Sequence, residues 1–109
     1  MPMVHVVTFT FDADVLDEVT TPLATALDEL ASRSNAIAYR HGADAGFRDG
    51  NAHYAITAVF GDRLAFESYL ADPLHHRITQ ELGNPYLRSR SAVQFHTRNL
   101  NAPERSEMT

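Results

Sequence analysis

The hydrophobic period of this chain switches between strand-like and helix-like values in an order that few folds accommodate. Residues 4–11 alternate with a period of two, which places His5, Val7 and Phe9 on one face of an expected strand. Apolar residues then recur at steps of three and four, as on one face of a helix: Leu16, Val19, Leu23, Leu27 and Leu30. Pro22 lies inside this stretch and predicts either a kink or a second helix that begins there.

The second half of the chain repeats the same succession. Residues 36–41 and 53–60 each predict a strand, and a polar loop over 43–51 separates them. A helix is expected to start at Gly61-Asp62. Asp72-Pro73 ends it and starts another, with Asp72 as N-cap. Residues 91–97 predict a fourth strand. This order is that of ferredoxin-like folds. We therefore predict an α+β fold in which a four-stranded antiparallel sheet carries helices on one face.

The sheet face that points away from the helices is expected to be uncharged. Alternation assigns to it eight residues, none of them acidic, Arg or Lys: Val6, Thr8, Thr10, Ala55, Thr57, Val59, Gln94 and His96. A sheet face open to water normally alternates to charged residues. Either this threonine-rich face is solvated, or a second copy of the chain covers it, sheet against sheet. We expect the homodimer.

Length and charge narrow the class of protein. A chain of 109 residues predicts one domain, over 1–98, followed by a polar, mobile C-terminal tail over 99–109. The net charge is −5 without a basic stripe, so neither nucleic acid nor an anionic membrane is an expected partner. No apolar run approaches the roughly 18 residues of a membrane helix, and no signal peptide is recognisable. We expect a cytoplasmic location.

Missing residue types exclude several chemistries. The chain has no Cys, and every basic residue other than His is an Arg, which excludes thiolate catalysis and lysine Schiff bases. No glycine-rich phosphate loop and no histidine pair with metal-motif spacing is present, so neither a cofactor nor a metal is expected.

Several other polar residues are weaker candidates for a role in a functional site. They are Tyr54 and four histidines: His41, His53, His76 and His96. The acidic residues at positions 12, 14, 17, 18, 28 and 29 are expected to form a solvated helix face.

Two segments resemble a known family. The strand His5-Val6-Val7-Thr8-Phe9-Thr10-Phe11 and the segment Tyr69-Leu70-Ala71-Asp72-Pro73-Leu74-His75 resemble the stress-responsive A/B barrel (Dabb) domain of the dimeric α+β barrel superfamily. The resemblance covers roughly residues 3–97. The chain departs from the family pattern where Asp72 replaces a usual His, where Ser34-Asn35 replaces a frequent Pro-Gly, and where His96 replaces a common Asp.

The resemblance implies a dimeric α+β barrel and a set of acid/base residues. Most members have no assigned activity. The best-defined member is a plant polyketide cyclase that performs an aldol condensation, and His5, Tyr69 and His75 match its acid/base set. By this analogy His75 is the general base, His5 orients it or binds a substrate carbonyl, and Tyr69 donates to an oxyanion. Each of the three also has an ordinary structural interpretation, as a helix-start or core residue.

These residues support three functional hypotheses. The first is a cofactor-independent acid/base catalyst acting on a small apolar carbonyl compound, most concretely a polyketide cyclase. The second is a non-catalytic, ligand-binding or stress-associated dimer. The third is a cofactor-free monooxygenase of quinol-like substrates, which is weakened by the absence of Trp. We expect a substrate pocket between the sheet and the helices, with Asp72 beside it. Its expected lining is apolar: Val7, Phe9, Leu23, Leu27, Ile56 and Phe66.

Overall fold

The computed structural model describes residues 2–97. In chain order the elements are β1 (Met3–Phe11), the 3-10 turn η1 (Ala13–Val15), α1 (Leu16–Arg33), β2 (Ala38–Ala43), β3 (Tyr54–Phe60), α2 (Arg63–Ala71), α3 (Pro73–Ile78), the π-helical turn η2 (Thr79–Gly83) and β4 (Leu87–His96). The tail expected over 99–109 lies outside the described residues.

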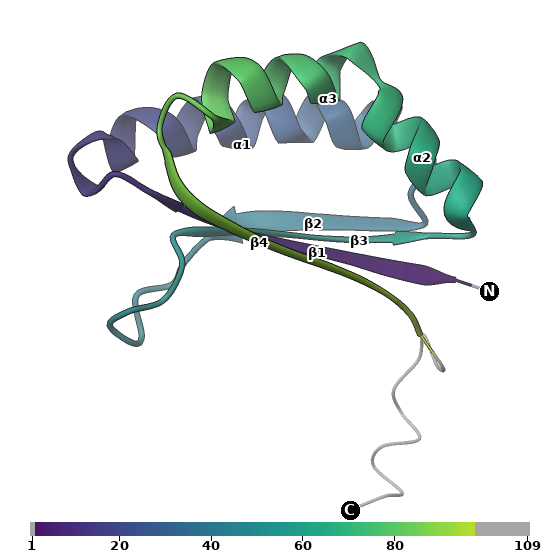
Figure 1. Cartoon of the computed structure of the whole chain (residues 1–109), viewed down its shortest axis with the longest axis horizontal. Coiled ribbons are helices and arrows are strands. Elements are labelled where there is room, and N and C mark those ends of the chain that lie inside the picture. Colours follow the sequence, from purple (N-terminus) through teal and green to yellow (C-terminus); the bar gives the residue numbers. More distant parts are fainter. Residues whose placement is uncertain (1, 98–109) are drawn as a thin grey trace, which may run out of the picture.

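The four strands form one antiparallel sheet in the order β2-β3-β1-β4. The helices all lie on one face of this sheet, and the other face is bare (Figure 1). The prediction of an α+β, ferredoxin-like fold is therefore confirmed. The first helix connects β1 to β2, and the α2–α3 pair connects β3 to β4.

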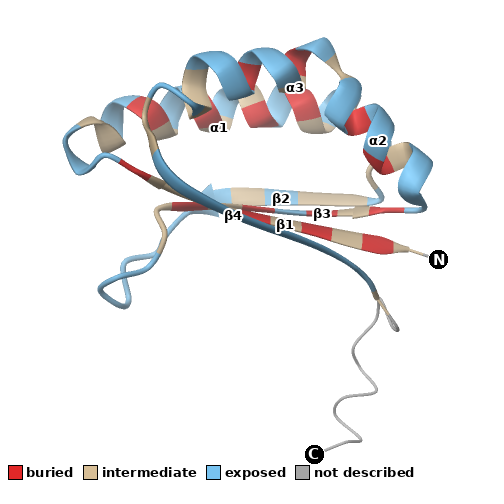
Figure 2. Cartoon of the chain, in the orientation of Figure 1, coloured by how far each residue is buried: buried red, intermediate tan, exposed pale blue. Residues whose placement is uncertain are grey.

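The core fills the space between the helices and the sheet (Figure 2). The apolar face of α1 contributes its buried leucines, and β1 and β3 contribute alternate residues, of which Phe11 is 1 % and Phe60 is 0 % exposed. Burial of one such side chain contributes about 1.5–3 kcal/mol. The strand and helix periods in the sequence thus meet in a single core.

The helix α1 runs through Pro22 from Leu16 to Arg33 without a break. A separate second helix starting at this proline, one of the two expectations, is not formed. Pro22 lies on the exposed side of α1, where the lost backbone N–H bond leaves a carbonyl that water can reach. The apolar residues on the opposite face keep both halves of the helix on the core.

Strand β4 is longer than its sequence pattern indicates. It starts at Leu87 rather than at residue 91, because Leu87 pairs with Phe11 and Ser89 pairs with Thr10, across an irregularity in the register. The residues at its start have no apolar alternation, so the pairing with β1 determines their conformation. Similarly, β2 occupies Ala38–Ala43 instead of 36–41, since its register follows β3.

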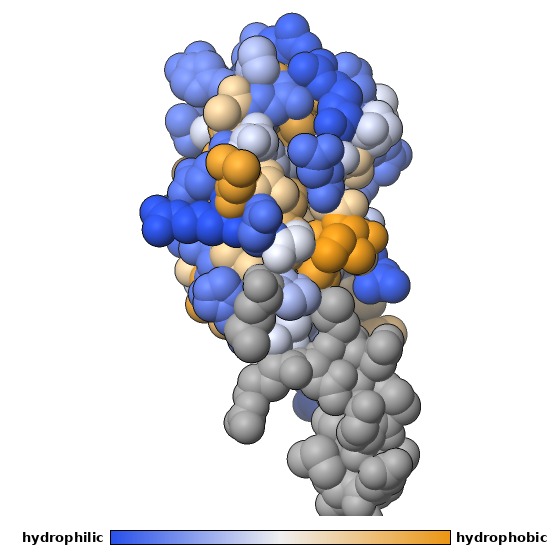
Figure 3. Space-filling model, turned by 90° about the vertical axis from the view of Figure 1, so that its right-hand side faces the viewer, coloured by the Kyte–Doolittle hydropathy of each residue, from blue (hydrophilic) through white to orange (hydrophobic). Residues whose placement is uncertain are grey.

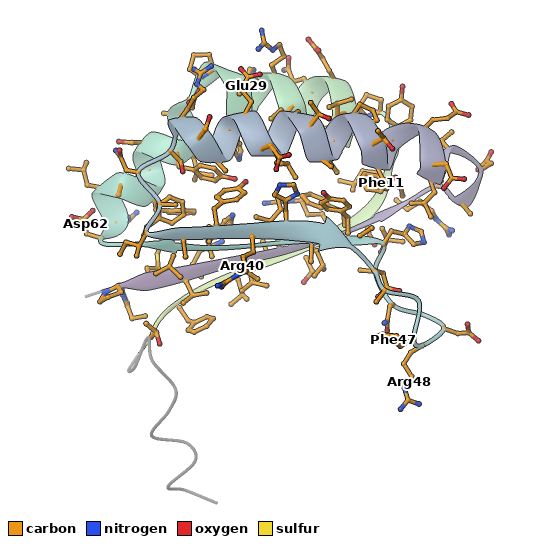
Figure 4. The ribbon with its side chains drawn as sticks, turned by 180° about the vertical axis from the view of Figure 1, so that it is seen from behind. Phe11, Glu29, Arg40, Phe47, Arg48 and Asp62 are labelled. Atoms are coloured by element: carbon orange, nitrogen blue, oxygen red, sulfur yellow. The ribbon has the colours of Figure 1, made fainter. Side chains whose placement is uncertain are left out.

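The composition predicted for the bare sheet face is partly wrong. Directly opposed residues of antiparallel strands point to the same face, and Gln94 is opposite His5 in the register. Gln94 and His96 therefore share the helix-covered side with His5, and Val93 and Phe95 take their place on the bare face. The β2 strand adds Arg40, opposite Thr57, which points away from the helices (Figure 4).

Candidate active site

Three residues from two distant segments of the sequence meet between the sheet and the helices. His5 comes from β1, Tyr69 from the last turns of α2, and His75 from the first turn of α3. The ring of Tyr69 contacts both imidazoles, with centroid distances of 6.1 Å to His5 and 5.0 Å to His75. The structure thus brings together the three residues that the sequence singled out.

Asp72 sets the position of His75. Its side chain accepts a hydrogen bond of 2.8 Å from the backbone N–H of Leu74 and so caps α3, while Pro73 occupies the first helical position. The same carboxylate oxygen accepts a 2.7 Å bond from Arg33 at the end of α1. Because Asp72 both ends α2 and starts α3, the break in the helix brings His75 back against Tyr69.

A cavity of about 230 Å³ adjoins the three residues. Its walls include five of the residues expected to contact substrate: Val7, Phe9, Leu23, Leu27 and Ile56. Phe66 and Asp72 are absent from the lining formed by residues 2–97. Phe66 instead packs on the ring of His5, at 4.9 Å between centroids, and Asp72 is occupied by its helix cap and by Arg33.

The cavity also has walls that sequence reasoning missed. Thr79, Gly83 and Asn84 line it from η2 and the segment after it, and Leu87 and Arg90 line it from β4. None of these residues belongs to an apolar repeat, and the long β4 that carries two of them was not predicted in full. Since Asn84 and Arg90 are exposed, this side of the cavity faces solvent.

His5 is held as a neutral hydrogen-bond donor. The Nε2 amide of Gln94 donates to its Nδ1 at 3.0 Å, so the ring proton is on Nε2. The residue is 3 % exposed. Burial, helped by His75 and Arg90, lowers the pKa of the imidazole from 6.5 to about 4. A group with this pKa is a poor base at neutral pH but presents a fixed N–H.

His75 contributes the second imidazole of the site. Burial lowers the pKa of its imidazole, Arg90 lowers it further, and Asp72 partly opposes both. The ring is therefore neutral at pH 7. Within residues 2–97, neither ring nitrogen of His75 has a protein hydrogen-bond partner. One nitrogen lone pair is consequently available to remove a proton from a bound molecule.

The phenol of Tyr69 is paired with a second tyrosine. The hydroxyl oxygens of Tyr69 and Tyr39 are 2.7 Å apart. Burial raises the pKa of Tyr69, and the hydrogen bond to Tyr39 partly offsets this. Burial also raises the pKa of Tyr39 above its usual value, so both phenols stay protonated. Apart from its place in a predicted strand, no feature of the sequence pointed to Tyr39.

Another chain of hydrogen bonds lies outside the cavity. His41 bonds Tyr54 through Nδ1 and Asp28 through Nε2, each at 2.7 Å. These bonds tie β2 and β3 to α1. The Asp28 side chain is 76 % exposed, as expected for a solvated helix face, and it also makes this contact. His53 has a comparable structural role, since its Nδ1 accepts a 3.0 Å bond from the backbone N–H of Phe11.

The described residues offer no group of three His, Cys, Asp or Glu side chains able to hold a metal ion. Over the same part of the chain, the helices are too short or too polar to cross a bilayer. The titratable groups gathered at the cavity are two imidazoles, a guanidinium and the phenol of Tyr69, which is hydrogen-bonded to that of Tyr39.

Comparison with solved structures places this fold among ferredoxin-like proteins. A dimeric ferredoxin-like protein of unknown function from Thermobifida fusca YX superposes with a TM-score of 0.81 at 28% identity, over 89% of this chain and 92% of that one. A dabb family protein with a ferredoxin-like fold from Mesorhizobium loti MAFF303099 superposes with a TM-score of 0.71 at 17% identity, over 90% and 98%. No family model matches the sequence, and no curated protein is significantly similar to it.

The same fold occurs in proteins whose names indicate different reactions. An antibiotic biosynthesis monooxygenase superposes with a TM-score of 0.73 at 17% identity, over 91% of this chain and 100% of that one. The hydroxynitrile lyase of Passiflora edulis superposes with a TM-score of 0.74 at 12% identity, over 92% and 97%. At these identities the likeness concerns the fold alone.

Proposed function

We propose that this protein is a cofactor-independent acid/base catalyst acting on a small, mostly apolar carbonyl compound. The observation that carries the proposal is the pairing of an unbonded neutral imidazole, His75, with two fixed donors, His5 and Tyr69, in one cavity with apolar walls. Such a base contributes about 10²–10⁴-fold to a proton transfer, and removal of one oxyanion donor costs about 10²–10³-fold.

The most concrete reaction is an aldol cyclisation of a poly-β-ketone. His75 removes a proton from the carbon between two carbonyl groups, and the resulting enolate oxygen accepts hydrogen bonds from Nε2 of His5 and from Tyr69. The enolate carbon then attacks a second carbonyl of the same molecule, which forms the new C–C bond. The alkoxide takes back the proton held on His75. In this scheme Tyr39 donates to Tyr69, which leaves the Tyr69 proton free for the substrate.

We further propose that the protein acts as a homodimer, joined through the bare sheet face. Val93 and Phe95 are 53 % and 48 % exposed on that face, and Val4, Val6 and Val59 lie beside them in the register. The similar Thermobifida fusca protein is described as dimeric. A separate exposed apolar region lies at the end of the molecule near α2 (Figure 3), where Leu64 is 75 % exposed.

Two alternative functions would use the same cavity. A non-catalytic ligand-binding dimer would hold the compound without moving its protons. A cofactor-free monooxygenase finds support in the fold it shares with the antibiotic biosynthesis enzyme, but the apolar walls and the absence of Trp favour carbonyl acid/base chemistry. Proton exchange separates these possibilities without knowledge of the natural substrate.

The test measures enolisation directly. A panel of small aryl and alkyl ketones is incubated with the protein in D₂O, and the loss of the α-proton signal is followed by ¹H NMR. We expect the wild type to accelerate exchange and His75→Ala to lose the acceleration. His76→Ala is the matched control, because His76 is the exposed neighbour on the same helix. If the ketones that bind all exchange only at the uncatalysed rate, the catalytic function is wrong and the ligand-binding function is favoured instead.

A further inference from the structure

Arg90 places a positive charge at the candidate cavity. It lies on β4 opposite Phe9, on the helix-covered side of the sheet, and lines the cavity. No carboxylate within residues 2–97 forms a salt bridge with its guanidinium. Arg33, Arg63 and Arg88 do form ion pairs, with Asp72, Glu67 and Asp12 respectively. Within residues 2–97, Arg40, Arg48 and Arg77 form none either, but they do not line the cavity.

The remaining lining of the cavity does not neutralise this charge. The other titratable residues in its walls are His5, Tyr69 and His75, and no acidic side chain is among the described lining residues. Both imidazoles are neutral at pH 7, and Arg90 is itself one cause of this. A bound molecule therefore meets neutral donors against apolar walls, and a positive charge on the side of the cavity that faces solvent.

We propose that the substrate is a keto acid whose carboxylate is bound by Arg90 while its ketone lies at His5, Tyr69 and His75. This inference rests on the proposed function and names its substrate class. A guanidinium presents a planar fork of N–H groups that matches the two oxygens of a carboxylate. The volume of about 230 Å³ is below the roughly 300–1,000 Å³ of pockets for drug-sized ligands, which requires a small acid.

The experiment compares a matched pair of probes, 4-oxo-4-phenylbutanoate and its methyl ester, which differ in the negative charge. Binding of each is measured by isothermal titration calorimetry at pH 7.5 and low salt. We expect the wild type to bind the acid at least about 10-fold more tightly than the ester, which is about 1.4 kcal/mol. Arg90→Gln should bring the ratio close to one. Arg88→Gln is the control, because it removes a positive charge from the same strand outside the cavity lining and should keep the preference.

Additional salt gives an independent readout. The affinity of the wild type for the acid should fall as NaCl screens the contact, while its affinity for the ester should not change. Equal affinities for the two probes, a preference for the acid that survives in Arg90→Gln, or no binding of the acid at millimolar concentration would each overturn the proposal. Circular dichroism melting of each variant shows that the fold is intact.

The same probes keep this inference separate from the proposed function. If the acid binds through Arg90 but its α-protons do not exchange in D₂O, the anion site stands and the catalytic function fails. If the ester exchanges as fast as the acid and binds as tightly, the catalytic function stands and the keto-acid class is wrong.

Discussion

Acidification should destabilise this protein through His5 over a defined pH range. The buried imidazole has a pKa of about 4 in the folded chain, against 6.5 when it is not perturbed. Because the unfolded chain binds the proton first, the folded state is fully favoured above about pH 6.5 and loses stability as the pH falls toward 4. The bond from Gln94 to Nδ1 favours the neutral ring and opposes protonation at that nitrogen.

The difference between these two pKa values sets the size of the effect. It is about 2.5 units, and each unit corresponds to 1.36 kcal/mol. Over the interval from pH 7.5 to pH 4.5, His5 should therefore cost about 2.5 kcal/mol of the free energy of unfolding, most of it below pH 6. That is a large part of the 5–15 kcal/mol by which a typical domain is stable.

The assay is urea unfolding at pH 7.5, 5.5 and 4.5, at one fixed protein concentration because a dimer makes stability depend on concentration. His5→Gln keeps a neutral side chain with a hydrogen-bond acceptor. Between pH 7.5 and pH 4.5, the loss in free energy of unfolding should be about 2.5 kcal/mol smaller in this variant than in the wild type. His76→Gln, at an exposed position, should behave as the wild type does.

A second readout follows the ring itself. In the ¹⁵N NMR spectrum, the two nitrogens of His5 should report the Nε2-protonated tautomer at pH 7.5 and remain unchanged down to about pH 5. If His5→Gln and the wild type lost the same stability between pH 7.5 and 4.5, or if the His5 ring titrated near 6.5, the neutral-donor role of His5 would be refuted.

Three further predictions concern the site and the interface. Tyr69→Phe should lower turnover by roughly 10²-fold with little change in binding, and Tyr39→Phe should give a smaller loss of turnover in steady-state kinetics; full activity in both would remove the phenols from the mechanism. Val93→Arg should dissociate the dimer in sedimentation velocity, because it places charge in the proposed interface, while Leu64→Arg on α2 should not; a wild-type monomer would contradict the interface. Asp72→Ala should destabilise the fold by about 1 kcal/mol through loss of the α3 cap, measured by urea unfolding, and unchanged stability would show that the cap is dispensable.

The site was predictable where it depends on local signals. Asp72-Pro73 specifies a helix start by its own chemistry, and the N-cap bond to Leu74 is present. Tyr69 and His75 lie on either side of that break, so their proximity follows from local geometry. Tyr39 and Gln94 carry no such signal. Their contacts with Tyr69 and His5 span 30 and 89 residues of sequence, and they exist only once the strands have paired.

The sequence by itself determined the order and type of the elements, because the periods of two and of three-to-four residues are local properties of the chain. Only the tertiary structure decided which side of β4 faces the helices. A shift of one residue in register exchanges the two faces of a strand, and the weak alternation around Arg88–Ser91 did not specify it. Pairing with β1 placed Gln94 and Arg90 on the cavity side and left Val93 and Phe95 on the bare face. The electrostatics of the site therefore depend on a strand register that no local pattern encodes.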